Sequence, residues 1–359
     1  MTYSFTTLSD LKAAGFDDVI DVRAPLEYAE DHIPGAINLP VLSDAERAEV
    51  GTIYVQEDRF RARKVGAAHV SRNAAHHLET VLRDKPGGWR PLVYCWRGGQ
   101  RSGSFASILA QIGWRVELLD GGYRSYRKEV VKTLYETPMD LQILLIDGMT
   151  GTAKTRILHR LAALGHQIID LEGLACHRGS LFGATGQDQP AQKSFESQLI
   201  EHLAGFDPGR PVLIEAESNK VGEILIPPSL WAAMQRAKRV EITASLGERA
   251  RFLERDYGDL TRDPDRLSKL IGALTSFHGH EKVAHWQDLA RTQGFADLAA
   301  ELMQDHYDPR YQRSRARNLP DTVLHQAIED LSEEGLEVAA KALSSKIRSY
   351  SKTTAGVPA

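Results

Sequence analysis

The sequence predicts an α/β protein with two successive α/β units and a mainly helical C-terminal part. Apolar segments of strand length alternate with helical segments in both halves of the chain, as in proteins built on parallel sheets. A short polar stretch at 135–140 separates the halves. The chain has 359 residues, of which 42% are hydrophobic, so it can form two domains that each bury a core.

The first unit is predicted over residues 1–135. Its elements are expected, in chain order, as a strand at 17–23, a turn and short strand at 32–40, a helix at 70–84, a strand at 91–96, a helix at 101–113, and a strand with a glycine turn at 115–122. This alternation predicts a mostly parallel sheet, because parallel neighbours need a crossover segment between them.

The second unit is predicted over residues 140–245. Strands are expected at 141–147, 166–172, 211–217 and 239–243, with helices at 154–164 and 191–205 and a polar, glycine-rich loop at 173–190. Residues 246–345 are predicted to be mainly helical and to pack on this unit, and residues 346–359 to form a disordered tail.

Composition excludes several classes of protein. A net charge of −4 is not that of a general polycation, so any nucleic-acid binding must come from local basic patches. No apolar run approaches the roughly 18–20 residues that span a bilayer, and the N-terminus lacks a signal-peptide pattern, so no membrane contact is expected. Two cysteines fit a reducing compartment rather than a disulfide framework. We therefore expect a cytoplasmic protein.

A candidate nucleophile, Cys95, ends the apolar strand Pro-Leu-Val-Tyr and precedes a glycine-rich turn. The N–H groups of that turn and the following helix N-terminus would lower the pKa of the thiol. Arg97 and Arg101 would add positive potential, and Ser102 opens the helix. The alternative is an inert, buried cysteine at a strand end.

A candidate phosphate-binding loop lies between the strand at 141–147 and the helix that follows. Gly148, Gly151, Lys154 and Thr155 match a Walker A loop, in which N–H groups surround a diphosphate, the lysine contacts its oxygens and the threonine can bind Mg²⁺. Ala153 stands where the strict pattern has glycine. Such a loop recognises a pyrophosphate group, which prenyl diphosphates carry as well as nucleotides. The alternative is a glycine turn before an amphipathic helix.

Three carboxylates end neighbouring strands of the second unit and are candidates for Mg²⁺ binding or substrate positioning. They are Asp170, Glu215 and Glu217. The alternative is that they are ordinary strand ends, and no dedicated protein metal site is predicted.

Two segments of the first unit resemble the rhodanese-like family. They are "DVRAPLEYAEDHIPGAINLP" (21–40) and "YCWRGGQRS" (94–102). The resemblance implies that Cys95 carries a sulfur or selenium atom. Five residues separate Cys95 from Arg101, where many single-domain rhodaneses have four, and the wider loop would accept a tetrahedral oxyanion such as phosphate or selenophosphate.

A rhodanese-like domain followed by a P-loop domain resembles the tRNA 2-selenouridine synthase family over about residues 5–315. The stretches 46–67, 171–186 and 215–227 extend the match. The resemblance implies a rhodanese-like parallel-sheet domain followed by a P-loop NTPase-like α/β domain with a helical C-terminal part.

The family resemblance also implies a reaction. The wobble 2-thiouridine of tRNA is geranylated with geranyl diphosphate, and the geranylthio group is then replaced by selenium from selenophosphate. Cys95 would form a selenylated intermediate, and the P-loop would bind the diphosphate. The expected partners are the tRNA anticodon region and an enzyme that supplies selenophosphate.

Basic clusters are candidates for tRNA binding, although each could equally be a solvated charged face. They are Arg59, Arg61, Arg63 and Lys64, then Arg236, Lys238 and Arg239, and then Arg310, Arg313, Arg315 and Arg317 with Tyr307 and Tyr311 interleaved. The histidine-rich stretch at 278–286 matches no standard metal spacing and is expected on a helix surface or in the geranyl or tRNA pocket. Cys176 is expected to be a bystander.

Two alternatives to a tRNA-modifying transferase are kept. A rhodanese-type sulfurtransferase with an attached nucleotide-binding P-loop domain predicts cyanide-dependent sulfur transfer without tRNA. A regulatory P-loop module with an inactive or phosphatase-like first domain predicts P-loop activity that survives Cys95→Ala.

Overall fold

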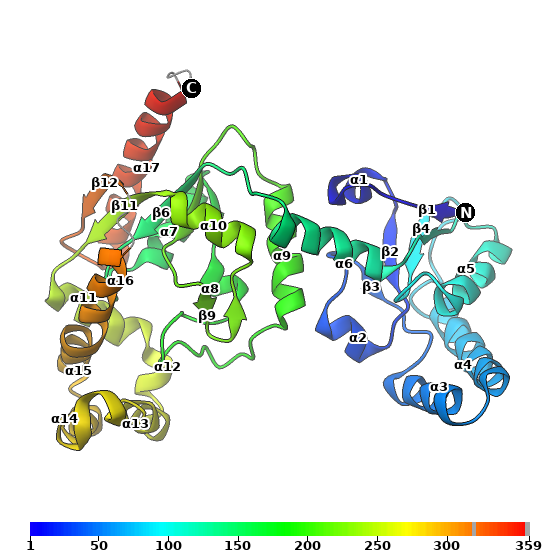
Figure 1. Ribbon diagram of the computed structural model, residues 1–359, viewed down its shortest axis with the longest axis horizontal. Coiled ribbons are helices and arrows are strands. Elements are labelled where there is room, and N and C mark those ends of the chain that lie inside the picture. Colours follow the sequence, from blue (N-terminus) through cyan, green and yellow to red (C-terminus); the bar gives the residue numbers. More distant parts are fainter. Residues whose placement is uncertain (318–320, 356–359) are drawn as a thin grey trace. The chain divides into compact units, whose positions relative to one another are not determined.

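Two parallel sheets, one in each of two compact units, organise the computed structural model, which describes residues 1–317 and 321–355 (Figure 1). The first unit comprises residues 1–137 and 190–204, and the second comprises the remaining described residues. Each unit is an α/β structure, so the predicted fold class is confirmed.

The sheet of the first unit has the strand order β1-β5-β4-β2-β3, and all of its pairs are parallel. Its strands are β1 (Thr2–Tyr3), β2 (Asp18–Asp21), β3 (Ile37–Asn38), β4 (Pro91–Tyr94) and β5 (Glu117–Leu119). Its helices are α1 (Leu8–Ala13), α2 (Pro25–Glu30), α3 (Asp44–Gln56), α4 (Arg59–Glu79), α5 (Gln100–Ile112), α6 (Tyr123–Val131) and the π-helical turn η1 (Lys132–Glu136). Every residue of β4 is buried, as expected for a central parallel strand.

Most of residues 46–67 lie in two helices, α3 and α4, whereas a helix was expected only from residue 70. Ser43 caps α3 and Asp58 caps α4 through side-chain hydrogen bonds to the backbone. The buried residues of α4 are mostly small, among them Ala62, Gly66 and Ala74. A stripe of small residues at helical spacing is a weak hydrophobic signal, which is why the pattern was missed.

The sheet of the second unit has the order β12-β11-β6-β8-β7 and is also parallel. Its strands are β6 (Ile143–Asp147), β7 (Gln167–Ile169), β8 (Val212–Glu215), β11 (Lys238–Thr243) and β12 (Thr322–Ala327). A short antiparallel pair is formed by β9 (Lys220–Val221) and β10 (Ile224–Leu225).

The helices of the second unit fall into two groups. Those associated with the sheet are α7 (Lys154–Ala163), α8 (Leu171–Leu174), α10 (Pro228–Arg236) and α17 (Glu333–Ala355). The helical region contains α11 (Leu246–Asp256), α12 (Gly258–Thr261), α13 (Pro264–Gly272), α14 (Thr275–Arg291), α15 (Phe295–Leu302), the π-helical turn η2 (Met303–Tyr307) and α16 (Asp308–Arg317). This region has its own buried cluster around Trp286.

The C-terminal segment corrects two expectations. Residues 346–355 continue helix α17 rather than form a disordered tail, because Leu343 and Ile347 are fully buried in the core of the second unit; residues 356–359 lie outside the described part. Strand β12 interrupts the region predicted to be mainly helical and pairs with β11. None of the helices in the described segments is both long enough and apolar enough to cross a bilayer.

Helix α9 (Gln192–Ala204) lies in the second half of the sequence but belongs to the first unit, so the expected continuous domain 140–245 is interrupted. Glu196 of α9 is fully buried, pairs with Arg127 and accepts a hydrogen bond from the Tyr135 hydroxyl. Ser197 donates to Asp31 Oδ2 at 3.0 Å. Buried polar contacts therefore bind α9 to this unit.

Replacing Glu196 by alanine would leave the Arg127 guanidinium, only 18% exposed, without its partner. We expect the free energy of unfolding of the first unit to fall by about 3 kcal/mol in a urea titration. Gln198→Ala is the matched control, since Gln198 lies on the same helix and its side chain donates a hydrogen bond to Ser194 one turn away. Equal losses for the two variants would contradict this role of Glu196.

Candidate active sites

Cys95 follows β4 directly and is 3% exposed. Its Sγ accepts hydrogen bonds from the Gly99 N–H at 3.3 Å and from the Ser102 hydroxyl at 3.1 Å. Helix α5 begins at Gln100, so the sulfur lies at the start of a helix, where backbone N–H groups have no partner within the helix.

These contacts decide the ionisation of Cys95. Burial raises the pKa of the thiol, but the hydrogen bonds from the Ser102 hydroxyl and from the N–H groups of Ser102, Gly99 and Arg97 outweigh burial and leave this pKa below its ordinary value. The thiolate is the nucleophilic form, so the loop activates Cys95 for nucleophilic chemistry. Ser102 was not assigned this role from the sequence, although its position in the first turn of the helix was a signal.

Close backbone packing fixes the shape of this loop. A Cβ atom at Gly122 would lie 2.3 Å from the Cys95 carbonyl oxygen, so only glycine fits there. The Tyr123 N–H donates to the Cys95 carbonyl at 2.8 Å, and the Arg124 N–H donates to the Trp96 carbonyl at 3.0 Å. The first residues of α6 therefore hold the backbone of the cysteine loop through these hydrogen bonds.

The two predicted arginines are placed differently from expectation. Arg101 forms a two-pronged ion pair with Glu27, at 2.5 Å between Nη1 and Oε2 and 3.2 Å between Nη2 and Oε1. Arg97 is exposed, and its backbone N–H is the group that acts on the sulfur. Arg97 lies in the cysteine loop and Arg101 in the first turn of α5, but hydrogen-bond donors rather than guanidinium charges lower the pKa of the thiol.

The predicted phosphate loop joins β6 to α7. Lys154 Nζ donates to the Gly148 carbonyl at 3.0 Å, and the loop encloses the end of this side chain. A Cβ at Gly148 would lie 2.7 Å from the Ile242 carbonyl oxygen, and Gly151 has a φ of +82°, so both positions require glycine. Ala153 has a φ of 59°, a left-handed conformation that costs an alanine about 1 kcal/mol.

The phosphate loop lines a cleft of about 800 Å³. Its basic lining residues are Lys154, Arg156, Arg178, Arg239 and Arg310. Arg239 was expected in a tRNA-binding surface cluster with Arg236 and Lys238, but it points into this cleft and pairs with Asp147 at 2.6 Å. Such a lining suits a phosphorylated ligand.

The three predicted carboxylates lie close to one another but have different surroundings. Asp170 caps α8 by accepting from the Gly173 N–H at 2.7 Å and pairs with His159. Glu215 is fully buried, and burial raises its pKa well above the ordinary value. Glu217 lines the cleft, and burial and the nearby Glu172 raise its pKa to about 8 against the effect of Lys154.

Glu172, which was not among the predicted site residues, contacts Thr155 of the predicted phosphate loop. It accepts a hydrogen bond from the Thr155 hydroxyl at 2.9 Å, and its N–H donates to Glu215 Oε1 at 3.0 Å. The described residues contain no group of three metal-ligating side chains. Mg²⁺ usually takes only one or two carboxylates and completes its shell with substrate phosphates and water. Thr155 and Glu172 fit that requirement.

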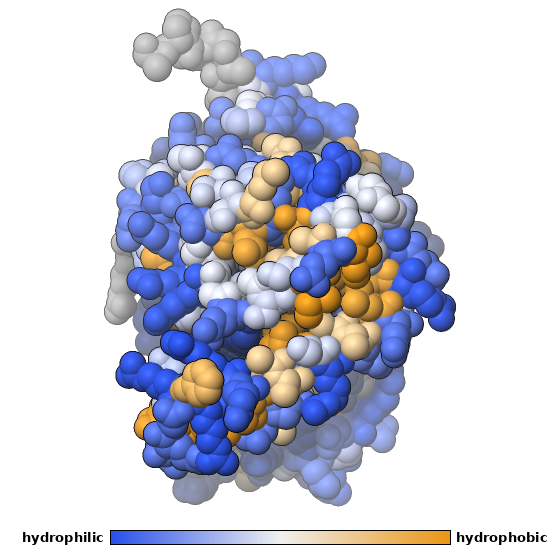
Figure 2. All heavy atoms as spheres, turned by 90° about the vertical axis from the view of Figure 1, so that its right-hand side faces the viewer, coloured by the Kyte–Doolittle hydropathy of each residue, from blue (hydrophilic) through white to orange (hydrophobic). Residues whose placement is uncertain are grey.

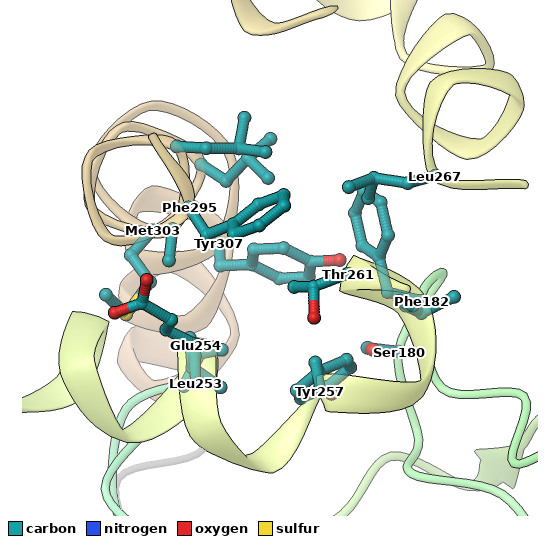
Figure 3. A pocket seen from close by; sticks show the side chains of 15 residues that line it. Ser180, Phe182, Leu253, Glu254, Tyr257, Thr261, Leu267, Phe295, Met303 and Tyr307 are labelled. Atoms are coloured by element: carbon teal, nitrogen blue, oxygen red, sulfur yellow. The ribbon is translucent and has the colours of Figure 1, made fainter. Parts of the chain in front are cut away.

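An apolar cavity of about 90 Å³ adjoins the cleft within the second unit (Figure 3). Side chains that line it include Phe182, Leu267, Phe295 and Met303, drawn from several helices and one loop. Five residues line both the cavity and the cleft: Thr150, Ser180, Leu253, Tyr257 and Tyr307. The combined site therefore suits an amphiphilic ligand with a phosphorylated head and a hydrocarbon chain.

The predicted tRNA-binding residues fall in both units. Arg59, Arg61, Arg63 and Lys64 are exposed at the start of α4, next to Phe60, which is 72% exposed. Figure 2 shows one face of the first unit, which is mainly hydrophilic with a band of apolar side chains. In the second unit, Arg310 lines the cleft and Arg313 is exposed on α16. Arg315 and Arg317 belong to α16, and their side chains lie outside the described part.

Comparison with known proteins gives matches over both units. Residues 4–129 match the model of the rhodanese-like domain, and residues 141–265 match the model described as the tRNA 2-selenouridine synthase AAA domain.

Three relatives named tRNA 2-selenouridine synthase illustrate the similarity. The protein from Pseudomonas syringae pv. syringae is 32% identical over 92% of this chain and 83% of its own length. The Pseudomonas putida protein is 34% identical over 76% of this chain and 73% of its own length. The Nitrosomonas europaea protein is 34% identical over 70% of this chain, and the match spans 66% of that relative, just under two thirds.

Replacing Ser102 by alanine removes a hydrogen bond to the Cys95 sulfur, so the pKa of this thiol should rise. We expect the pH profile for iodoacetamide alkylation of Cys95, followed by peptide mass spectrometry, to move to higher pH. Ser107→Ala on the same helix, whose hydroxyl bonds to the Gly103 carbonyl, should leave the profile in place. An unmoved profile for Ser102→Ala would show that the hydroxyl does not control the thiol.

Proposed function

The chain belongs to the tRNA 2-selenouridine synthase family, and on this basis we propose that it is a tRNA-modifying transferase that converts wobble 2-thiouridine into 2-selenouridine. The observation that carries the proposal is the apolar cavity next to the phosphate cleft. That pairing favours a prenyl diphosphate over a nucleotide as the ligand of the P-loop. The activated Cys95 of the first unit supplies a second reactive centre.

In the first proposed step, the second unit binds geranyl diphosphate. The N–H groups of the 148–153 loop and Lys154 hold the diphosphate, and the hydrocarbon chain enters the cavity. The sulfur of 2-thiouridine attacks the first carbon of the geranyl group, the carbon–oxygen bond breaks, and its electron pair leaves with pyrophosphate. The N3 proton of the base passes to solvent.

Charge neutralisation is what this step demands of the protein. The leaving pyrophosphate gains negative charge, and Lys154 faces it from the loop. Thr155 and Glu172 would hold Mg²⁺, which would add positive charge beside the diphosphate when bound. The buried Glu215 accepts a hydrogen bond from the Glu172 N–H and thereby positions Glu172.

In the second proposed step, the cysteine loop receives selenophosphate. The backbone N–H groups around Cys95 suit its oxyanion. The Cys95 thiolate attacks the phosphorus, the phosphorus–selenium bond breaks, and selenide leaves with the electron pair, so the selenium keeps its oxidation state. The selenide then attacks C2 of the geranylated base, geranylthiolate leaves, and water hydrolyses the phosphorylated Cys95 to release phosphate. Alkylation prepares this displacement, since an alkylated sulfur leaves more readily than a thiocarbonyl sulfur. An enzyme that produces selenophosphate is the expected supplier.

The proposal is tested by nucleoside mass spectrometry on 2-thiouridine tRNA incubated with the protein, geranyl diphosphate, Mg²⁺ and selenophosphate. We expect Cys95→Ala to stop at the geranylated nucleoside and Lys154→Ala to lower geranylation by about 100-fold or more, as for the loss of one charge-stabilising group. Cys176→Ala and the exposed Lys341→Ala are the matched controls. Unchanged tRNA, together with cyanide-dependent sulfur transfer, would instead establish a sulfurtransferase.

The role of the apolar cavity is tested by filling it. Ala299 lines the cavity from α15. The larger side chain of Ala299→Phe should displace about two methylene groups of the ligand from the cavity. Losing their burial should weaken geranyl diphosphate binding by about tenfold. Isothermal titration should show unchanged binding of inorganic pyrophosphate. Ala296→Phe, on the same helix but outside the lining, is the size-matched control. Equal weakening for both ligands would refute the assignment of the cavity to the hydrocarbon chain.

A further inference from the structure

Four side chains of the second unit form a connected row beside the phosphate cleft: Phe277, His278, His306 and Arg310. His278 Nε2 and His306 Nδ1 are 2.9 Å apart, and His306 Nε2 lies 3.0 Å from Arg310 Nη1. The guanidinium carbon of Arg310 lies 4.4 Å from the ring centroid of Phe277. The row joins α14, η2 and α16.

The hydrogen bonds of this row have only one consistent direction. A guanidinium can only donate, so His306 Nε2 accepts from Arg310. Burial, together with the charge of Arg310 and the proximity of His278, lowers the pKa of His306 to about 4, so this imidazole is neutral near pH 7. Neutral His306 therefore carries its proton on Nδ1 and donates to His278 Nε2. The row holds the guanidinium in one orientation over the Phe277 ring.

The inner end of the row is fixed in the core. The His278 ring meets the Trp286 ring edge-on at 4.9 Å, and Trp286 is fully buried. Gly279, with φ +77°, breaks α14 just after His278, and Phe277 remains 61% exposed. The histidine-rich stretch at 278–286 therefore contributes His278 to the support of an exposed aromatic ring.

The outer end of the row is fixed to the phosphate loop. Asp308, at the start of α16, pairs with Arg249 at 2.8 Å, and Arg249 donates to the Thr150 carbonyl at 3.1 Å. Arg249 is 5% exposed, so this link is shielded from water. Arg310 lines the cleft from the same helix. The exposed Phe277–Arg310 pair thus keeps a constant position relative to the cleft.

We propose that the Phe277–Arg310 pair is a stacking platform for an unpaired nucleobase of the RNA substrate. A phenylalanine ring and a guanidinium plane are the surfaces on which splayed bases stack, and Arg310 with the exposed Arg313 matches the charge of an RNA backbone. Continuity with the phosphate cleft places such a base beside the group-transfer site. This inference rests on the proposed tRNA substrate and names the residues that recognise it.

The test is fluorescence anisotropy with two labelled RNAs, an anticodon stem–loop and a fully paired duplex of the same length. Phe277→Ala should weaken stem–loop binding by about tenfold and leave duplex binding unchanged, since stacking needs an unpaired base. Phe277→Trp should retain the affinity. Val338→Ala, at a residue that is 69% exposed on α17, is the control for loss of an exposed apolar side chain.

Arg310→Lys tests the guanidinium plane separately from its charge. Lysine keeps the charge but neither stacks as a plane nor holds the same bond to His306, so stem–loop affinity should again fall by about tenfold. Wild-type affinity in Phe277→Ala, or equal losses on both RNAs, would overturn the platform while leaving the proposed function intact. A wild-type protein that binds neither RNA would overturn both.

Discussion

Both candidate active sites depend on one constraint: a buried parallel strand ends at a glycine-containing loop that passes directly into a helix. In the first unit, β4 leads through the Cys95 loop into α5, and in the second, β6 leads through the phosphate loop into α7. The first N–H groups of a helix have no partner within it. Around Cys95 they stabilise a thiolate, and at the start of α7 such groups suit an anionic ligand.

Close packing behind each loop makes this arrangement rigid. Gly122 and Gly148 stand where a Cβ would collide with backbone atoms of a neighbouring segment, so neither loop can move outward without losing those contacts. Ala153 differs from these glycines: it adopts a left-handed backbone conformation although its Cβ makes that conformation less favourable than it is for glycine. The fold thus retains a small local strain at the start of α7, next to Lys154, as is common at binding sites.

In the second unit, different elements form the polar cleft and the apolar cavity. Strand ends and the phosphate loop supply the charged cleft, while α11, α13 and α15, with η2 and the 173–190 loop, supply the apolar cavity. Tyr257 and Tyr307 lie where the two meet. Helix α9 comes from the second half of the sequence but packs in the first unit. Its buried Glu196 pairs with Arg127, and its buried Ser197 donates a hydrogen bond to Asp31.

The sequence by itself determined the features that depend on local spacing. Strand–loop–helix order, the position of Cys95, and the Gly148–Thr155 loop could be predicted because each is contained within about ten residues. The tertiary structure alone decided the contacts between distant residues: Glu27 with Arg101, which are 74 positions apart, and Thr155 with Glu172. The cavity, the pairing of β12 and the burial of α17 were missed for the same reason. Hydropathy patterns identify a buried face, but which distant segment covers that face is decided by packing.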